Sequence, residues 1–253
     1  MIIQIKKFIV DNFPLSSRKV YHTVNKFIYK GNKYYCPICE REFRRFLPGP
    51  DRIKSNSKCP GCSSLERHRL LWLYLKDKLN ILNSKIELLN IAPDYSTQNK
   101  LMKLVNIDYT SVDLDSPLAI QKADLTKLPF EVNRFDAIIC YHVLEHIEND
   151  RKAMSELFRV LKPGGWAILQ TPIDDERVET FEDFTVTSLQ ERKKIFGQED
   201  HVRIYGKDYF ARLRKAGFDV TEDAYIRKFN QSEIEKFVLD KDEKICFCLK
   251  PNQ

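Results

Sequence analysis

Four cysteines near the start of the chain form two Cys-x-x-Cys pairs, Cys36 with Cys39 and Cys59 with Cys62. This spacing is typical of a zinc ribbon, in which each pair supplies two thiolates from one tight turn. Four thiolates complete a closed tetrahedral site, which holds Zn²⁺ structurally and leaves no open position for chemistry. The sequence therefore predicts a structural zinc bound by residues 31–62.

Disulfides are the alternative use of these cysteines. The chain has 7 cysteines, and the three outside the pairs lie in apolar runs: Cys140, Cys246 and Cys248. We expect these three to be buried free thiols. Free thiols together with thiolate zinc ligands indicate a reducing compartment, so we expect a cytoplasmic protein.

The elements that position this chemistry divide the chain into four parts. Residues 1–30 are predicted to be a helical lead-in, with a short amphipathic helix at Met1–Phe13 that is neither a secretory signal nor a membrane span. The ribbon follows at 31–62 and a connecting helix at 63–84, which begins in a capping-box sequence, Ser63 to Glu66. Residues 85–253 alternate strands with helices, as in a doubly wound, Rossmann-like α/β sheet. Ligands of such sheets bind outside the carboxyl ends of the strands.

Composition fits an ordinary globular protein with a mixed surface. Hydrophobic residues make up 43% of the chain, and 42 basic residues are interleaved with 36 acidic ones to give a net charge of +6. This balance favours a solvated surface over a nucleic-acid patch. The densest basic stretch is Arg41 to Lys58, within the ribbon.

Two stretches in the second half carry a family resemblance. Phe135–Ile147 reads FDAIICYHVLEHI, and Glu156–Gly165 reads ELFRVLKPGG. Together they resemble the class I S-adenosylmethionine-dependent methyltransferases (type 11-like), over roughly residues 85–250. The resemblance implies a Rossmann-like methyltransferase sheet, S-adenosyl-L-methionine as cofactor and methyl transfer as the reaction.

A third stretch, Asn90–Ser96, stands where this family has a Gly-x-Gly loop against the methionine end of the cofactor. It reads NIAPDYS and has no glycine. Its Ala-Pro-acid sequence resembles a subset of the family that carries an N-terminal zinc ribbon. The resemblance implies that Asn90, Ala92 and Pro93 contact the cofactor.

The other cofactor positions follow from the same family. A carboxylate that ends the second strand accepts hydrogen bonds from the ribose hydroxyls. Asp113 fits this role, with Asp115 as a competitor. The resemblance places Asp124 and Leu125 at the adenine, and Tyr141 and His142 at the carboxyl edge facing the transferred methyl.

The polar stretch Phe196–Gly206 reads FGQEDHVRIYG and also resembles the ribbon-bearing subset. Loops over a rigid scaffold concentrate binding residues, so we expect the acceptor here. Gln198, Arg203 and Tyr205 are predicted to bind it. His201 is the first choice for the base that removes the acceptor's proton, with His142 or Asp200 as alternatives. A structural hydrogen-bond network is the alternative reading of this stretch.

These residues predict a methyltransferase that acts on a small polar or sugar-linked acceptor by O- or N-methylation, in surface-glycan or secondary-metabolite biosynthesis. One rival is an RNA methyltransferase that reads RNA through basic ribbon residues, namely Arg41, Arg44, Arg45, Arg52 and Lys54. Another rival is a non-catalytic scaffold that lost the cofactor with its glycines. We expect the ribbon to brace the catalytic domain, because its aromatic residues among the basic ones are limited to Phe43 and Phe46.

Overall fold

The computed structural model describes residues 15–49 and 54–252. The helix expected at Met1–Phe13 lies outside these residues, and so does Arg52. Among the described residues, no helix is both long and apolar enough to cross a bilayer.

A seven-stranded mixed sheet forms the centre of the molecule, in the order β10-β11-β7-β6-β3-β4-β5. Its strands are β3 (Ile86–Ile91), β4 (Ile107–Asp113), β5 (Gln121–Lys122), β6 (Phe135–Tyr141), β7 (Leu161–Gln170), β10 (Asp219–Asp223) and β11 (Ile245–Leu249). β3 pairs in parallel with β4 and β6, whereas β11 runs antiparallel to both β7 and β10. The expected doubly wound, Rossmann-like sheet is confirmed in this mixed form.

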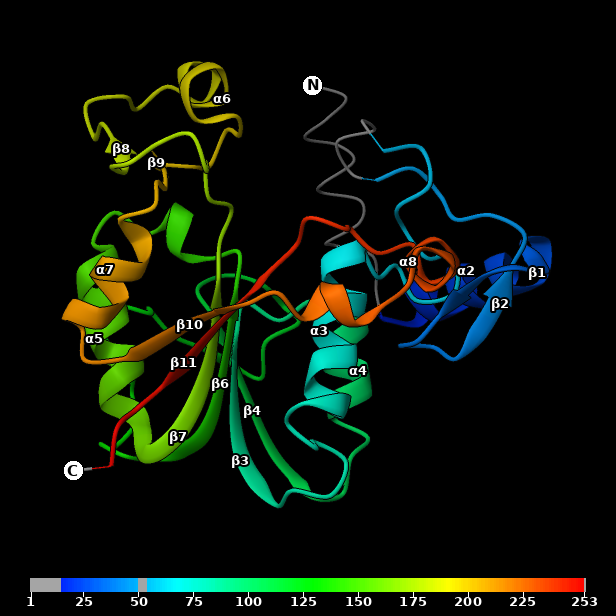
Figure 1. The fold of residues 1–253 in the computed structure, drawn as a ribbon, viewed down its shortest axis with the longest axis horizontal. Helices are drawn as coiled ribbons and strands as arrows, with labels where there is room; N and C mark the ends of the chain where they lie inside the picture. Colours follow the sequence, from blue (N-terminus) through cyan, green and yellow to red (C-terminus); the bar gives the residue numbers. More distant parts are fainter. Residues whose placement is uncertain (1–14, 50–53, 253) are drawn as a thin grey trace.

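Both faces of the sheet are covered, as Figure 1 shows. The helices α5 (Asp150–Val160) and α7 (Tyr209–Lys215) lie on one face, and α3 (Glu66–Asp77) and α4 (Tyr95–Leu101) lie on the other. The apolar runs of the central strands follow from this, because successive residues face opposite layers. Ile138 is buried on the α5 side, and its neighbour Ile139 is buried on the α3 side.

The connecting helix is shorter than the sequence predicts, since α3 spans only Glu66–Asp77. The capping box expected at Ser63–Glu66 does not form, because Ser63 is in the left-handed region at φ 63° and α3 begins only at Glu66. The Glu66 carboxylate instead accepts a hydrogen bond from Ser57 in the ribbon. β7 begins at Leu161, which pairs with Phe135 ahead of an irregularity in the ladder.

The ribbon lies on the α3 side of the sheet (Figure 1). It follows α2 (Leu15–Ile28) and contains the antiparallel strands β1 (Lys30–Cys36) and β2 (Arg41–Phe43). Its buried residues Cys36 and Phe43 belong to the same hydrophobic cluster as Leu88 of the sheet. The ribbon is therefore packed into the body of the protein rather than held on a linker.

Arg69 of α3 ties the ribbon to the C-terminal part of the chain. Its side chain is fully buried, and its guanidinium donates to the carbonyls of Ser57 and Ser64 at 3.0 and 2.7 Å. On its other side it donates to the carbonyls of Phe237 and Val238, at the end of α8 (Gln231–Phe237). A buried charge is tolerated when its donors are all used in this way.

We expect Arg69→Ala to lower the free energy of unfolding by about 3 kcal/mol or more, because each buried carbonyl left without a donor costs about 1–3 kcal/mol. The midpoint of urea unfolding measures the loss. Arg41→Ala on the exposed face of β2 is the matched control, with an expected change within about 0.5 kcal/mol. Equal midpoints for the two variants would contradict the role assigned to Arg69.

Candidate functional site

The carboxyl ends of the parallel strands meet at one edge of the sheet. β3, β4, β6 and β7 are neighbours in register, so the residues that follow them lie side by side. Two of these residues leave their strands with left-handed backbones, Ala92 at φ 47° and His142 at φ 59°. Such conformations in residues other than glycine cost free energy and cluster at functional sites.

The turn after β3 is built by Asp94. This carboxylate accepts from the backbone N–H groups of Ser96 and Thr97 and caps α4. Ala92 takes the left-handed conformation that glycine would adopt more readily. Asn90 lies near the end of β3 and is buried. Its side-chain amide donates to the Tyr109 hydroxyl at 2.9 Å.

The structure separates Asp113 from its competitor at the end of β4. Asp113 is half-buried and accepts from the N–H groups of Asp115 and Ser116 through Oδ1. The Asp115 side chain is 86% exposed and faces Lys122. Asp113 is therefore the carboxylate held in a fixed orientation at the strand edge.

The two residues expected near the adenine lie in the loop after β5. Leu125 is buried, whereas Asp124 is exposed and holds the loop through hydrogen bonds from the Thr126 N–H and hydroxyl. The loop therefore offers an apolar wall at Leu125.

Sequence analysis missed Arg67 and His68, which α3 brings to this edge. His68 Nδ1 lies 3.4 Å from the Asp94 carboxylate and accepts from the Leu65 N–H. Burial lowers the pKa of His68 to about 4, against the opposing effect of Asp94. The Nε atom of Arg67 is buried with no hydrogen-bond partner among the described residues. These residues lie on a helix that precedes the sheet, and no sequence motif of the predicted cofactor site includes them.

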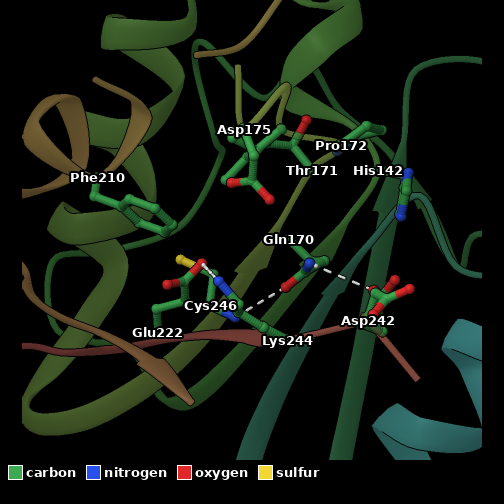
Figure 2. A pocket seen from close by; sticks show the side chains of 12 residues that line it. His142, Gln170, Thr171, Pro172, Asp175, Phe210, Glu222, Asp242, Lys244 and Cys246 are labelled. Atoms are coloured by element: carbon green, nitrogen blue, oxygen red, sulfur yellow. Dashed lines mark hydrogen bonds and ion pairs between the residues drawn. The ribbon is translucent and has the colours of Figure 1, made fainter. Parts of the chain in front are cut away.

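The far side of the same edge contains a cavity of about 240 Å³ (Figure 2). Its lining includes four carboxylate side chains: Asp175, Glu222, Asp242 and Glu243. His142, Gln170 and Phe210 also line it, and Lys244 forms an ion pair with Glu222. Burial raises the pKa of Glu243, and that carboxylate accepts from the Tyr141 hydroxyl at 3.1 Å. The cavity is polar and predominantly acidic.

The polar stretch Phe196–Gly206 follows α6 (Leu189–Phe196) and contains β9 (Arg203–Ile204), which pairs with β8 (Phe181–Glu182) above the carboxyl end of β7 (Figure 1). The Arg203 side chain is fully buried and donates to the backbone carbonyls of Leu144 and Glu148. The Tyr205 hydroxyl donates to Asp150. These contacts correspond to the structural-network alternative, and Gln198 remains exposed.

His201 is buried in this network rather than placed on the cavity wall. It packs edge-to-face on His146, with ring centroids 4.7 Å apart. Burial lowers the pKa of His201. His201 does not appear among the described residues that line the cavity, whereas His142 does. His146 and its neighbour Glu145 were not among the predicted site residues. Glu145 is buried, at 2% exposure.

The four ribbon cysteines converge. Their sulfur atoms lie within 4.8 Å of one another, with Cys36 3.6 Å from Cys62 and Cys39 3.7 Å from Cys59. All four are free thiols, and a disulfide would need about 2.05 Å between the sulfurs. A tetrahedron with Zn–S bonds of about 2.3 Å has edges of about 3.8 Å, so the donor set fits zinc.

The region around this edge matches a known family. Residues 91–169 match the family described as a methyltransferase domain. This segment of the chain is thus similar to a methyltransferase domain. The matched segment runs from the end of β3 to β7 and includes Asp113, Tyr141 and His142.

Two curated relatives of this region are methyltransferases by name. The ubiquinone/menaquinone biosynthesis C-methyltransferase UbiE of Brucella canis is 30% identical over 117 residues, which cover 40% of this chain and 43% of that protein. The demethylmenaquinone methyltransferase of Streptomyces avermitilis is 40% identical over 52 residues, covering 21% of this chain and 22% of that protein. The chain thus spans less than half the length of these curated relatives.

Among solved structures, the (4+2) cyclase SpnF superimposes with a TM-score of 0.52 at 16% identity, covering 75% of this chain and 84% of that one. At this identity the likeness shows the fold alone. The named activity of SpnF illustrates that a shared fold does not fix the reaction.

The lowered pKa of His68 predicts a pH dependence of stability. Because the folded pKa of about 4 lies below the unfolded value of 6.5, the unfolded state binds more protons between these values. The contribution is complete above pH 6.5 and is lost as the pH falls. We expect His68→Gln to remove about 2 kcal/mol of the loss of stability between pH 7 and pH 5. Urea unfolding of both proteins at the two pH values measures the difference, and parallel pH profiles would contradict it.

Proposed function

We propose that the protein transfers a methyl group from S-adenosyl-L-methionine to an oxygen or nitrogen of a small polar acceptor. The observation that carries this proposal is the acidic cavity beside the carboxyl ends of β6 and β7 in a methyltransferase domain. Transfer needs little covalent help from the protein. It requires alignment of the acceptor with the methyl and removal of one proton.

The residues at the strand edge suit the cofactor. Its ribose hydroxyls would donate to Asp113, whose second carboxylate oxygen carries no hydrogen bond from the turn that Oδ1 caps. Its methionine carboxylate would pair with Arg67, whose buried Nε otherwise lacks an acceptor. Ala92 and Pro93 would pack against the methionine end, Asn90 would support this segment from within the sheet, and the adenine would lie against Leu125 and Asp124. The cofactor supplies the electrophilic methyl.

The acceptor would occupy the acidic cavity. Carboxylates favour hydroxyl or amine groups, which they can hold by hydrogen bonds or charge, over the apolar bodies of quinones and sterols. A volume of about 240 Å³ fits a small molecule or one sugar unit. This supports a polar or sugar-linked acceptor. We propose surface-glycan or secondary-metabolite biosynthesis in a reducing cytoplasm as the setting.

His142 is the residue we assign to proton removal. It lines the cavity and leaves β6 at the edge where the methyl would lie. His201 was the first expectation, and Asp200 an alternative, but His201 is enclosed beside His146. Exposed Gln198 stays as a contact for a larger acceptor, whereas the fully engaged Arg203 and Tyr205 hold the loop.

The ribbon would hold one Zn²⁺ through Cys36, Cys39, Cys59 and Cys62 and brace α3. Several contacts support bracing over RNA reading. Lys54 is paired with Asp240 at 2.6 Å, and the guanidinium groups of Arg44 and Arg45 lie over the Tyr29 ring. The carboxylates of the cavity would also repel a phosphate backbone.

Calorimetry with S-adenosylhomocysteine tests the cofactor site. We expect Arg67→Ala and Asp113→Ala each to weaken binding by about 10–150-fold, since each removes charge-assisted hydrogen bonds worth about 1.5–3 kcal/mol. Asp115→Ala is the matched control and should bind like the wild type. Absence of binding to the wild-type protein would favour the scaffold alternative, and a loss in Asp115→Ala alone would move the ribose role to that residue.

The acceptor class is tested by methyl transfer from labelled S-adenosylmethionine to a panel of small amines, sugars and sugar nucleotides, beside quinone and sterol acceptors and RNA. We expect label in a polar small molecule, and about 10²–10⁴-fold slower turnover in His142→Gln with unchanged S-adenosylhomocysteine affinity. Arg41→Ala, on the exposed face of β2, is the control. Label only in a quinone, a sterol or RNA would overturn the acceptor assignment.

A further inference from the structure

We propose that Glu145, His146 and His201 form a second metal site, which binds a divalent transition metal such as Zn²⁺. The carboxylate oxygen and ring nitrogens of these residues lie within 4.8 Å of one another. Two imidazoles and one carboxylate are a donor set that zinc uses in proteins with a fourth position open. The site is separate from the ribbon, and its occupancy does not depend on the proposed methyl transfer.

One oxygen of the buried Glu145 carboxylate is unsatisfied. The Glu145 side chain is 3% exposed, and its Oε1 has no hydrogen-bond partner of acceptable geometry among the described residues. The nearest ring nitrogens are His142 Nδ1 at 3.4 Å and His146 Nε2 at 3.9 Å. A buried carboxylate oxygen without a donor is costly, and a cation between it and the rings would satisfy it.

The His146 ring is oriented by a backbone carbonyl. His146 Nδ1 lies 3.1 Å from the carbonyl oxygen of Asp200. A carbonyl oxygen only accepts, so Nδ1 carries the proton, and a neutral ring then presents the lone pair of Nε2 toward Glu145. His201 packs edge-to-face on this ring, and its nitrogen lies within 4.8 Å of the other two donor atoms. Histidines that ligate metals characteristically donate their other N–H to a carbonyl or carboxylate.

The carboxylate is anchored in the same manner. Glu145 Oε2 accepts from the Thr171 hydroxyl at 2.9 Å, which leaves Oε1 as the oxygen directed at the rings. The backbone supports this arrangement, because the Val202 N–H donates to the Glu145 carbonyl and so fixes His201 beside the 3-10 helix η1 (Leu144–His146). The Glu145 and His146 side chains are thus each held by a second hydrogen bond, and the backbone bond of Val202 holds His201, while the donor atoms converge.

An ion pair between a protonated histidine and Glu145 is the competing explanation. It would satisfy Oε1 with one proton and would need neither the second ring nor a metal. At His146 it would place a positive charge against His201, whose ring centroid is 4.7 Å away, and at His142 it would leave the converging His146 and His201 rings without a role. A metal uses both rings as neutral donors and so accounts for the whole cluster.

The cluster adjoins the cavity. Thr171 contacts Glu145 and lines the cavity, as does His142, which Figure 2 shows at the cavity's edge. If the proposed function holds, a metal here would act next to the acceptor. A bound divalent cation lowers the pKa of a hydroxyl or water that it coordinates, so it would assist removal of the acceptor's proton.

Zinc content after equilibrium dialysis against Zn²⁺ tests the proposal. We expect about two zinc ions per chain in the wild type, one in the ribbon and one in this cluster, and about one in Glu145→Gln and in His201→Asn. His68→Asn, which removes a buried histidine outside the cluster, should retain about two. Retention of two ions by both cluster variants would overturn the proposal.

Anomalous diffraction at the zinc edge locates the ions in the wild-type protein and needs no variant. The proposal requires a peak between Glu145, His146 and His201 besides the ribbon peak. A ribbon peak alone, or a second peak elsewhere, would overturn it. Calorimetry with S-adenosylhomocysteine on the same samples reports the cofactor site, so a failure of the proposed function is distinguishable from a failure of the metal site.

Discussion

The buried guanidinium of Arg69 is the contact on which the arrangement of the molecule depends. It donates to the carbonyls of Ser57 and Ser64 in the ribbon and to those of Phe237 and Val238 at the end of α8. A side chain with fewer donors could not make all four hydrogen bonds. By joining these segments it holds α3 between the ribbon and the end of α8. Because Arg67 and His68 precede Arg69 on the same helix, fixing α3 also delivers them to the carboxyl edge, where Asp94 caps α4. A structural ribbon thereby shapes a site that it does not line.

The sequence was sufficient for the parts of the site that lie on strands. Phe135–Tyr141 is an apolar run bounded by polar residues, and it forms β6 with the same limits. Parallel strands expose their carboxyl ends at one edge, so Asp113 and His142 could be placed together before any coordinates. The convergence of the two Cys-x-x-Cys pairs was also predictable. Each pair occupies one tight turn, and a zinc ion in a structural site takes four such ligands.

The rest depends on contacts between distant segments, which local patterns do not encode. Arg203 looked like a free phosphate or carboxylate ligand, but its donors are used by carbonyls of the Leu144–Glu148 segment. The sequence predicts His201 as the base, but its ring packs on His146, which lies in a different segment of the chain. Arg67 stood in a helix whose orientation is decided by tertiary hydrogen bonds. The capping box does not form because Ser63 is left-handed and α3 begins only at Glu66, whose carboxylate accepts from the distant Ser57.

The link between ribbon and cofactor edge is tested most directly by calorimetry of S-adenosylhomocysteine binding to Cys59→Ser, with circular dichroism to verify that the sheet remains folded. If zinc in the ribbon holds α3 in place, its loss withdraws Arg67 from the cofactor, and affinity should fall by about tenfold or more, equal to about 1.4 kcal/mol. Wild-type affinity in a folded, zinc-free variant would contradict the claim that the ribbon positions the site.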